Sequence, residues 1–529
     1  MKKRAAVMFL LIVIIFSVTG VRLYDLSASE MMASGGSSTK TIDVATLRGT
    51  VYDCNMCSLT NSEYEIYAAA KPSNEALAAL KGRVMPDAYE SIMQRMHKGN
   101  PVAIKVSSEL ESTENIIAVK VPKRYSAAST ACHIIGSINS EMQGVSGVEK
   151  SFNDILSKNN STVSFRFSAN ALGKVMLGEG ITVLGNSAPK NGVVLTLDRD
   201  IQRITEAVLD ASGVKCGSAV VIEIDSGAIK ACVSRPLYNQ NNISVSLKEE
   251  NSPLINRAFL PFSVGSVFKP VVAAAALQNN ISENFEYNCT GSVTFNGVTF
   301  HCHKKEGHGV LDMESAVAYS CNTYFIALAH KTGAENIINT ASDFGFGKKI
   351  NFAQDMESEK GNLPSVEELD SKAAIANISF GQGSLLATPI QICSMMATIA
   401  NDGEYVEPYL VEGETDENGY FTRYYRYEKG HKIISGPTAE RLQDFLEKVI
   451  EYGSGSRAKS EYVSLAGKTA TAQTGKTKNG EEIYNAWFAG YFPSDAPKYA
   501  VAVLKEDGGE GAISCAPVFK EIAEKLIDF

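Results

Sequence analysis

The segment PFSVGSVFKPVVAAAALQ at residues 261–278 carries a serine and a lysine at the start of an apolar helix. Ser266 and Lys269 stand three positions apart, so a helix places them on one face, where the amine can take the proton of the hydroxyl. Pro270 is tolerated only in the first turn of a helix, which puts Ser266 near the helix N-terminus. The helix dipole and burial both lower the pKa of Lys269. We therefore expect a serine nucleophile with a lysine as its base.

Two further motifs follow along the chain. SCN at residues 320–322 lies in an apolar helical segment, where its hydroxyl and amide are suited to relaying a proton and holding a substrate amide. KTA at residues 468–470 lies in an expected strand, whose edge can pair with an extended peptide while the lysine and threonine bind a terminal carboxylate. Each motif alone is weak evidence, because serine and lysine also stand three apart at Ser456 and Lys459. Their order and spacing are more specific.

Strand and helix patterns place the three motifs in one large domain. Apolar strands at 218–224 and 228–234 flank a hairpin signal, helical segments such as 313–330 follow, and strands return after residue 463. A sheet built from early and late strands and packed against central helices is an α+β arrangement.

The three motifs and their flanks resemble the penicillin-binding protein transpeptidase family. AVAYSCNTYF at 316–325 and AGKTATAQTGK at 466–476 match the family's second and third motifs, and residues 379–403 resemble a further signature of it. RGTVYD at 48–53 and GVEKSFNDIL at 147–156 resemble the non-catalytic pedestal of the monofunctional, class B members. The third motif usually ends in glycine, where this chain has Ala470.

The resemblance implies a peptidoglycan D,D-transpeptidase, a serine-type acyltransferase that cross-links stem peptides with release of the terminal D-Ala. Its implied catalytic residues are the nucleophile Ser266, the base Lys269, the proton relay Ser320, and Lys468. Its implied substrate-binding residues are Asn322 for the peptide, Thr469 beside Lys468 for the terminal carboxylate, and Thr471. The backbone N–H groups of Ser266 and Thr471 are the implied oxyanion hole.

The expected fold class is α+β, with a penicillin-binding/β-lactamase-like domain whose central antiparallel sheet is flanked by helices. The expected divisions are a cytoplasmic N-terminus at 1–4, a transmembrane signal-anchor at 5–21, a linker at 22–45, a smaller α+β pedestal, dimerisation-like domain at 46–187, and the transpeptidase domain at 192–529.

The N-terminus predicts the location of the protein. Lys2, Lys3 and Arg4 precede an uncharged apolar run, and positive charges remain in the cytoplasm. We expect a single-pass protein of the cell membrane with its catalytic domain outside. Small residues at Ser27 and Ser29 leave a cleaved signal peptide as the alternative to an uncleaved anchor.

The ten cysteines suggest one candidate disulfide. Cys289 and Cys302 flank an expected hairpin and form the best pair for a bridge. The neighbouring His301, His303 and His308 invite a zinc hypothesis, but the segment is loop-like and has no nearby C-x-x-C pair. We therefore expect a solvated loop there, no metal and no cofactor.

The expected partners follow from the family and the charge. They are peptidoglycan stem peptides, β-lactam antibiotics, the cytoplasmic membrane, and a separate SEDS-type glycan polymerase with other cell-wall synthesis proteins. A net charge of −9 argues against binding nucleic acid. Two alternatives stay open: a D,D-carboxypeptidase, and a catalytically weak scaffold or activator of the polymerase, which Ala470 alone supports. A β-lactamase lacks such a pedestal, and a bifunctional synthase needs a glycosyltransferase domain.

Overall fold

The computed structural model describes residues 2–35, 38–170, 173–295, 297–353, 355–425, 430–478 and 480–529. These residues divide into two compact units. Unit 1 comprises residues 1–49, 60–124 and 159–189, and unit 2 comprises residues 50–59, 125–158 and 190–529. Residues 50–59 and 125–158, which the sequence assigned to the pedestal, thus belong to unit 2. Strand β2 (Thr50–Tyr52) explains part of this, because it pairs in parallel with β8 (Gly192–Leu195).

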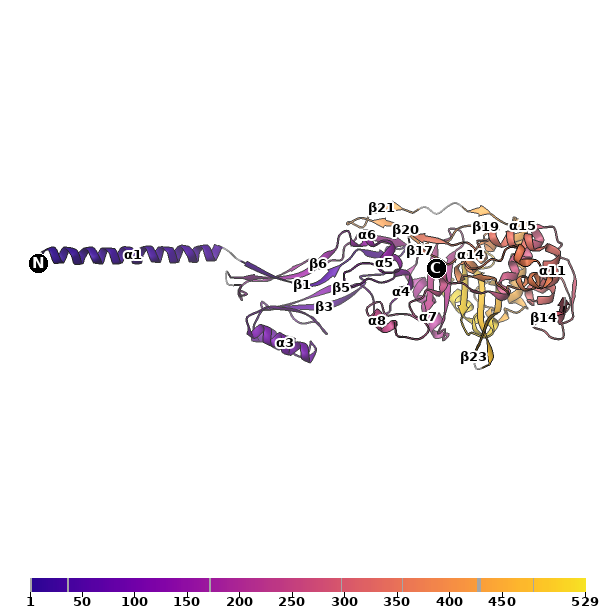
Figure 1. Cartoon of the computed structure of the whole chain (residues 1–529), viewed down its shortest axis with the longest axis horizontal. Helices are drawn as coiled ribbons and strands as arrows, with labels where there is room; N and C mark the ends of the chain where they lie inside the picture. Colours follow the sequence, from indigo (N-terminus) through magenta and orange to yellow (C-terminus); the bar gives the residue numbers. More distant parts are fainter. Residues whose placement is uncertain are drawn as a thin grey trace. The chain divides into compact units, whose positions relative to one another are not determined.

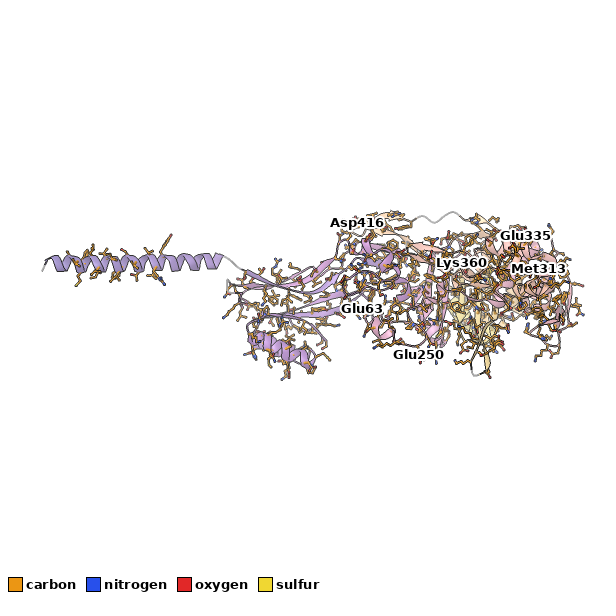
Figure 2. All side chains as sticks on the ribbon, viewed as in Figure 1. Glu63, Glu250, Met313, Glu335, Lys360 and Asp416 are labelled. Atoms are coloured by element: carbon orange, nitrogen blue, oxygen red, sulfur yellow. The ribbon has the colours of Figure 1, made fainter. Side chains whose placement is uncertain are left out.

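The N-terminal helix α1 runs from Lys2 to Gly35. Its residues Ala6–Tyr24 form a stretch of 19 residues that is long and apolar enough to cross a membrane, and their side chains point outward with no covering (Figure 2). No other helix among the described residues meets that test.

Most of the expected linker at 22–45 has regular secondary structure. Helix α1 continues to Gly35, and strand β1 (Ser38–Leu47) begins three residues later and pairs antiparallel with β6 (Ser161–Ala169). The hydrogen bonds of this ladder satisfy the backbone of residues 38–45, which the sequence had assigned to the linker. Gly36 and Ser37, the middle of that linker, lie outside the described residues.

Unit 1 contains two small sheets. One has the order β1-β6-β7, and the other has the order β4-β3-β5. The remaining elements of unit 1 are β3 (Glu63–Ala70), α2 (Asn74–Leu80), α3 (Pro86–His97), β4 (Val102–Val106), β5 (Ile116–Lys123) and β7 (Ile181–Leu184). Buried Leu80, Ile92 and Met96 from the two helices pack on the β4-β3-β5 sheet.

Unit 2 is built around a five-stranded sheet with the order β10-β9-β25-β24-β23, and every neighbouring pair is antiparallel. The label β23 in Figure 1 marks the edge strand of this sheet, which is drawn in yellow. Its strands are β9 (Gly217–Glu223), β10 (Ile229–Arg235), β23 (Ala466–Lys478), β24 (Glu481–Phe492) and β25 (Tyr499–Lys505). The first two strands come from the start of the domain and the last three from its end. The expected α+β fold with a central antiparallel sheet is therefore confirmed.

Helices cover both faces of this sheet. Ala500 and Ala502 of β25 share a buried core with residues of α14 (Pro389–Ala400), whereas Val501 and Val503 share another with residues of α17 (Ala516–Leu526). Alternate residues of a strand point to opposite faces, so one strand packs against a helix on each side. The other long helices of unit 2 are α7 (Arg199–Ala211), α9 (Lys269–Gln278), α11 (Asn322–Thr332), α12 (Ala334–Asp343), α13 (Lys372–Ser379) and α15 (Gly436–Glu451).

Shorter elements complete unit 2. Strands β2, β8, β20 (Val411–Thr415) and β21 (Phe421–Tyr424) form a four-stranded sheet. The strand pairs are β11 (Phe262–Ser263) with β18 (Leu386–Ala387), β12 (Tyr287–Cys289) with β15 (Gly309–Leu311), β13 (Ser292–Phe295) with β14 (Val298–His301), β16 (Asn351–Ala353) with β17 (Met356–Glu357), and β19 (Glu404–Tyr405) with β22 (His431–Lys432). The short helices are α4 (Cys132–Ile135), α5 (Gly147–Ser151), α6 (Asn153–Ser157), α8 (Ile243–Ser246), α10 (Met313–Ala318) and α16 (Gly511–Ser514).

Candidate functional site

Ser266 lies in the tight turn η2 (Gly265–Phe268), which continues into α9. The N–H of Gly265 donates to the carbonyl of Gly381 at 2.9 Å, and the φ of Gly265 is +60°. A Cβ on Gly381 would lie 2.0 Å from the carbonyl oxygen of Gly265, so only glycine fits there. This close backbone contact fixes the turn that carries the serine.

Lys269 starts α9 and is fully buried. Its Nζ donates to the carbonyl of Ser320 at 2.6 Å, to the Oγ of Ser320 at 3.1 Å, and to the Oδ1 of Asn322 at 2.8 Å. Burial lowers the pKa of Lys269 to about 8. The lysine therefore connects the helix that follows Ser266 to the second motif, and its amine can act as a base near neutral pH.

The second motif interrupts the helix that the sequence predicted over residues 313–330. Helix α10 ends at Ala318, α11 begins at Asn322, and Ser320 between them has a φ of +56°. A serine in the left-handed region costs about 1–2 kcal/mol and is held there by its surroundings. The break turns the carbonyl and hydroxyl of Ser320 toward Lys269, which an unbroken helix would not do.

The third motif lies on β23, an edge strand that pairs only with β24 among the described strands. Lys468 is fully buried, and burial followed by the charge of Lys269 holds the pKa of Lys468 well below its usual range. The hydroxyl of Thr469 donates to the Oγ of Ser454 at 3.0 Å. The hydroxyl of Thr471 accepts a hydrogen bond from the N–H of Gly511 at 3.2 Å.

Ala470, which departs from the family pattern, faces a residue without a side chain. A Cβ built on Gly265 would lie 3.4 Å from the Cβ of Ala470 and 3.2 Å from that of Ala472. Because Gly265 has no Cβ, the methyl group of Ala470 fits beside the turn that carries Ser266.

These elements enclose a cleft of about 610 Å³. The residues that line it are Ser266, His303, Ser320, Asn322, Ser454, Thr469, Ala470, Thr471, Tyr484, Gly509, Glu510 and Ala512. Five of the seven expected site residues are among them. The other two, Lys269 and Lys468, are buried and contact lining residues.

The sequence did not single out Ser454 or Glu510 as site residues. Ser454 belongs to the turn after α15, and its N–H donates to the carbonyl of Ala318 at 2.9 Å. No motif marks either residue, because each reaches the cleft only through the folding of distant segments. His303, weighed only as a metal ligand, also lines the cleft.

One group of side chains beside the cleft could hold a metal. The donor atoms of Cys289, Cys302, His308 and Cys321 all lie within 4.8 Å of one another. Cys289 and Cys302 are free thiols, so the expected disulfide is not formed. The expected hairpin between them exists as β13 and β14. The two thiols lie near the side chains of His308 and Cys321 as well as near each other.

The comparisons with known proteins agree on one family. Residues 217–524 match the penicillin binding protein transpeptidase domain. Penicillin-binding protein PbpB of Mycolicibacterium smegmatis is 30% identical over 441 residues, which cover 77% of this chain and 64% of PbpB. Peptidoglycan D,D-transpeptidase MrdA of Acinetobacter baumannii is 26% identical over 550 residues, which cover 89% of this chain and 80% of MrdA. The chain thus spans less than two thirds of the length of PbpB.

A solved structure has the same fold. The D,D-transpeptidase domain of a peptidoglycan glycosyltransferase from Eggerthella lenta superimposes with a TM-score of 0.66 and 25% sequence identity, covering 91% of this chain and 98% of that one.

Proposed function

The chain belongs to the class B branch of the penicillin-binding protein transpeptidase family, and we propose that it cross-links peptidoglycan stem peptides through an acyl-enzyme on Ser266. The observation that carries the proposal is the hydrogen bonding of Lys269. Its amine joins the helix of the nucleophile to Ser320 and Asn322 of the second motif at the wall of one cleft.

Acylation begins with attack by the Oγ of Ser266 on the penultimate D-Ala carbonyl of a stem peptide. The proton of the hydroxyl passes to the amine of Lys269, whose pKa of about 8 leaves a useful fraction neutral near pH 7.5. The carbon–nitrogen bond to the terminal D-Ala then breaks. Ser320, 3.1 Å from the lysine, delivers the proton that the leaving amine needs.

The substrate is held by β23. An extended peptide can pair with the free edge of the strand, and the hydroxyl of Thr469, with Lys468 behind it, binds the terminal carboxylate. The backbone N–H groups of Ser266 and Thr471 stabilise the developing oxyanion, a contribution of about 3–4 kcal/mol in comparable sites.

The acyl-enzyme is resolved by the amine of a neighbouring stem peptide, which forms the cross-link and frees Ser266. A β-lactam enters the same cleft, and its ring amide acylates Ser266 in place of the stem peptide. The scaffold alternative rested on Ala470, and Gly265 opposite it removes the steric reason for doubting acylation.

The N-terminal helix supports a membrane-anchored protein with its catalytic domain outside the cytoplasm. The apolar stretch Ala6–Tyr24 follows Lys2, Lys3 and Arg4, which remain on the cytoplasmic side. A separate SEDS-type polymerase in the same membrane is the proposed source of the glycan strands.

Intact-mass analysis of the full-length protein in detergent tests the proposal. Incubation with benzylpenicillin should add one drug mass to the wild type and none to Ser266→Ala. Incubation with a stem-peptide donor and an amine acceptor should then yield the cross-linked product. A folded wild-type protein that forms no adduct would refute the role of Ser266, and release of free tetrapeptide alone would indicate a carboxypeptidase.

A further inference from the structure

Four metal-binding side chains converge beside the active-site cleft from separate parts of unit 2. Cys289 ends β12, Cys302 follows β14, His308 precedes β15, and Cys321 lies between α10 and α11. The three thiols are buried, with 2%, 3% and 0% of their surfaces exposed, and His308 is partly buried. Their donor atoms lie within 4.8 Å of one another.

We propose that Cys289, Cys302, His308 and Cys321 bind one zinc ion and that this ion holds the second motif in its active shape. The binding of zinc stands independently of the proposed function. Its effect on acylation rests on that function.

The distances between the donor atoms fit a tetrahedral ion. The Sγ atoms of Cys302 and Cys321 are 3.9 Å apart, and the Nδ1 of His308 lies 3.6 Å from the Sγ of Cys289 and 3.5 Å from that of Cys302. Tetrahedral zinc with its usual bond lengths separates two sulfurs by about 3.8 Å and a sulfur from a nitrogen by about 3.6 Å. A disulfide would need sulfurs about 2.0 Å apart.

The ligand chemistry selects zinc. Three thiolates and one imidazole nitrogen form a Cys₃His set, which is typical of structural zinc sites, whereas magnesium and calcium require oxygen ligands. Four protein ligands fill the tetrahedral shell, so no position remains for a reacting water. The ion is therefore structural. A disulfide would use only two of the three thiols and leave the third beside it.

Other buried cysteines of the chain have different surroundings. The Sγ of Cys393 donates to the backbone carbonyls of Val220 and Ala500 at 3.5 and 3.3 Å. The convergence at Cys302 is therefore not what burial of a cysteine alone produces, and Cys393 offers a matched control.

The position of Cys321 connects the ion to catalysis. Cys321 lies between Ser320 and Asn322, the two residues that accept all three hydrogen bonds of Lys269. The Nδ2 of Asn322 also donates to the carbonyl of His301, the residue before Cys302, at 3.1 Å. An ion bound to both Cys321 and Cys302 therefore holds the two segments that this hydrogen bond joins. It also supports the left-handed backbone of Ser320, the residue before Cys321.

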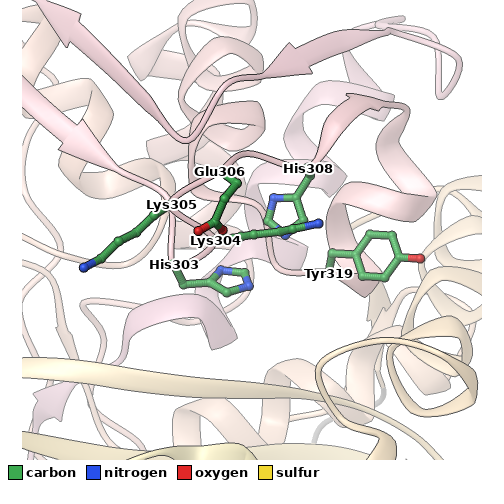
Figure 3. A pocket seen from close by; sticks show the side chains of 6 residues that line it. All are labelled: His303, Lys304, Lys305, Glu306, His308 and Tyr319. Atoms are coloured by element: carbon green, nitrogen blue, oxygen red, sulfur yellow. The ribbon is translucent and has the colours of Figure 1, made fainter.

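Two histidines lie on the loop after β14, and His308 rather than His303 is the proposed zinc ligand. Figure 3 shows both rings at a pocket that Lys304 and Tyr319 also line, and the ring of Tyr319 stacks on His308 with centroids 5.8 Å apart. Only His308 belongs to the four-ligand group. His303 is the matched control for its removal.

Metal analysis of the full-length protein in detergent tests the site. After loading with one equivalent of zinc and desalting, the wild type, His303→Ala and Cys393→Ser should each retain about one zinc ion per chain. Cys302→Ser and His308→Ala should retain less than about a tenth of that. Wild-type protein that retains no zinc, or variants that retain as much as the wild type, would overturn the site, as would a disulfide between any two of the three cysteines.

A spectroscopic test on the wild type alone guards against variants that fail to fold. Cobalt(II) in place of zinc should give the strong visible bands of a tetrahedral site and an ultraviolet thiolate-to-cobalt band. X-ray absorption of the zinc form should show sulfur ligands at about 2.3 Å and one nitrogen at about 2.0 Å. Weak octahedral bands or an all-oxygen shell would contradict the proposal.

The positioning role has its own readout. Removal of zinc with a chelator should slow acylation by a fluorescent penicillin about 10- to 100-fold, and zinc but not magnesium should restore it. Unchanged acylation by zinc-free protein would overturn the positioning role and leave the binding site standing. If zinc-loaded wild type is not acylated at all, the proposed function fails while the metal analysis still decides the site.

Discussion

The Nζ of Lys269 donates a hydrogen bond to the backbone carbonyl of Ser320 at 2.6 Å, its shortest contact in the site. The acceptor is a backbone carbonyl, and Ser320 has a φ of +56° at the break between α10 and α11. The hydrogen bonding of the lysine thus depends on a backbone conformation as well as on the side chains of the motif.

The rate of acylation should rise with pH through about 8. Lys269 accepts the proton of Ser266 only when its amine is neutral, and burial lowers the pKa of Lys269 to about 8, so the active fraction grows as pH increases through that value. Second-order rate constants for benzylpenicillin between pH 6 and pH 9.5 measure the profile. A midpoint above pH 10 would mean that the lysine is not desolvated in the working enzyme.

Gly265 should be far more sensitive to a methyl group than Ala470. Gly265→Ala places a Cβ 3.2 Å from the Cβ of Ala472 and forces a left-handed residue, which costs about 1–2 kcal/mol, so we expect a lower Tm and at least tenfold slower acylation. Ala470→Gly restores the family residue and should change the acylation rate by less than about threefold. A large gain in rate from Ala470→Gly would show that the methyl group does crowd the nucleophile turn.

Ser454 should matter for substrate binding although no motif contains it. Ser454→Ala removes the acceptor that orients the hydroxyl of Thr469, a loss of about 1 kcal/mol or roughly fivefold in affinity. The expected effect is a higher KM for the stem-peptide donor with little change in kcat. Ser456→Ala is the control, because Ser456 lies in the same turn and does not line the cleft. Equal effects of the two variants would argue against an orienting role.

The sequence predicted which motif residues meet at the cleft, because they lie in short motifs with fixed local geometry. Ser266 and Lys269 share one helical turn, and KTA lies on an edge strand. The antiparallel sheet was also predicted, since β9, β10 and β25 are largely apolar runs.

Three features that the sequence did not predict depend on tertiary structure. The apolar pattern continues through Ser320, so nothing local indicates the left-handed break that Lys269 stabilises. The pairing of β2 with β8 joins strands that are distant along the chain. Cys289 and Cys302 were matched as neighbours across a hairpin, whereas the approach of Cys321 depends on how α10 and α11 pack beside it.

Asn322→Asp should shift the pH profile of acylation upward. The Oδ1 of Asn322 lies 2.8 Å from the Nζ of Lys269, so the substitution places a carboxylate against the ammonium with little change in shape. An opposite charge at this distance favours the charged amine and raises its pKa by about 1–3 units, which leaves less neutral base near pH 7.5. We expect acylation at that pH to slow at least tenfold and to recover at high pH. Asn322→Ala removes the same hydrogen bond without adding a charge, so it should slow acylation while the midpoint stays near pH 8. If both variants keep that midpoint, Lys269 is not the group whose ionisation limits acylation.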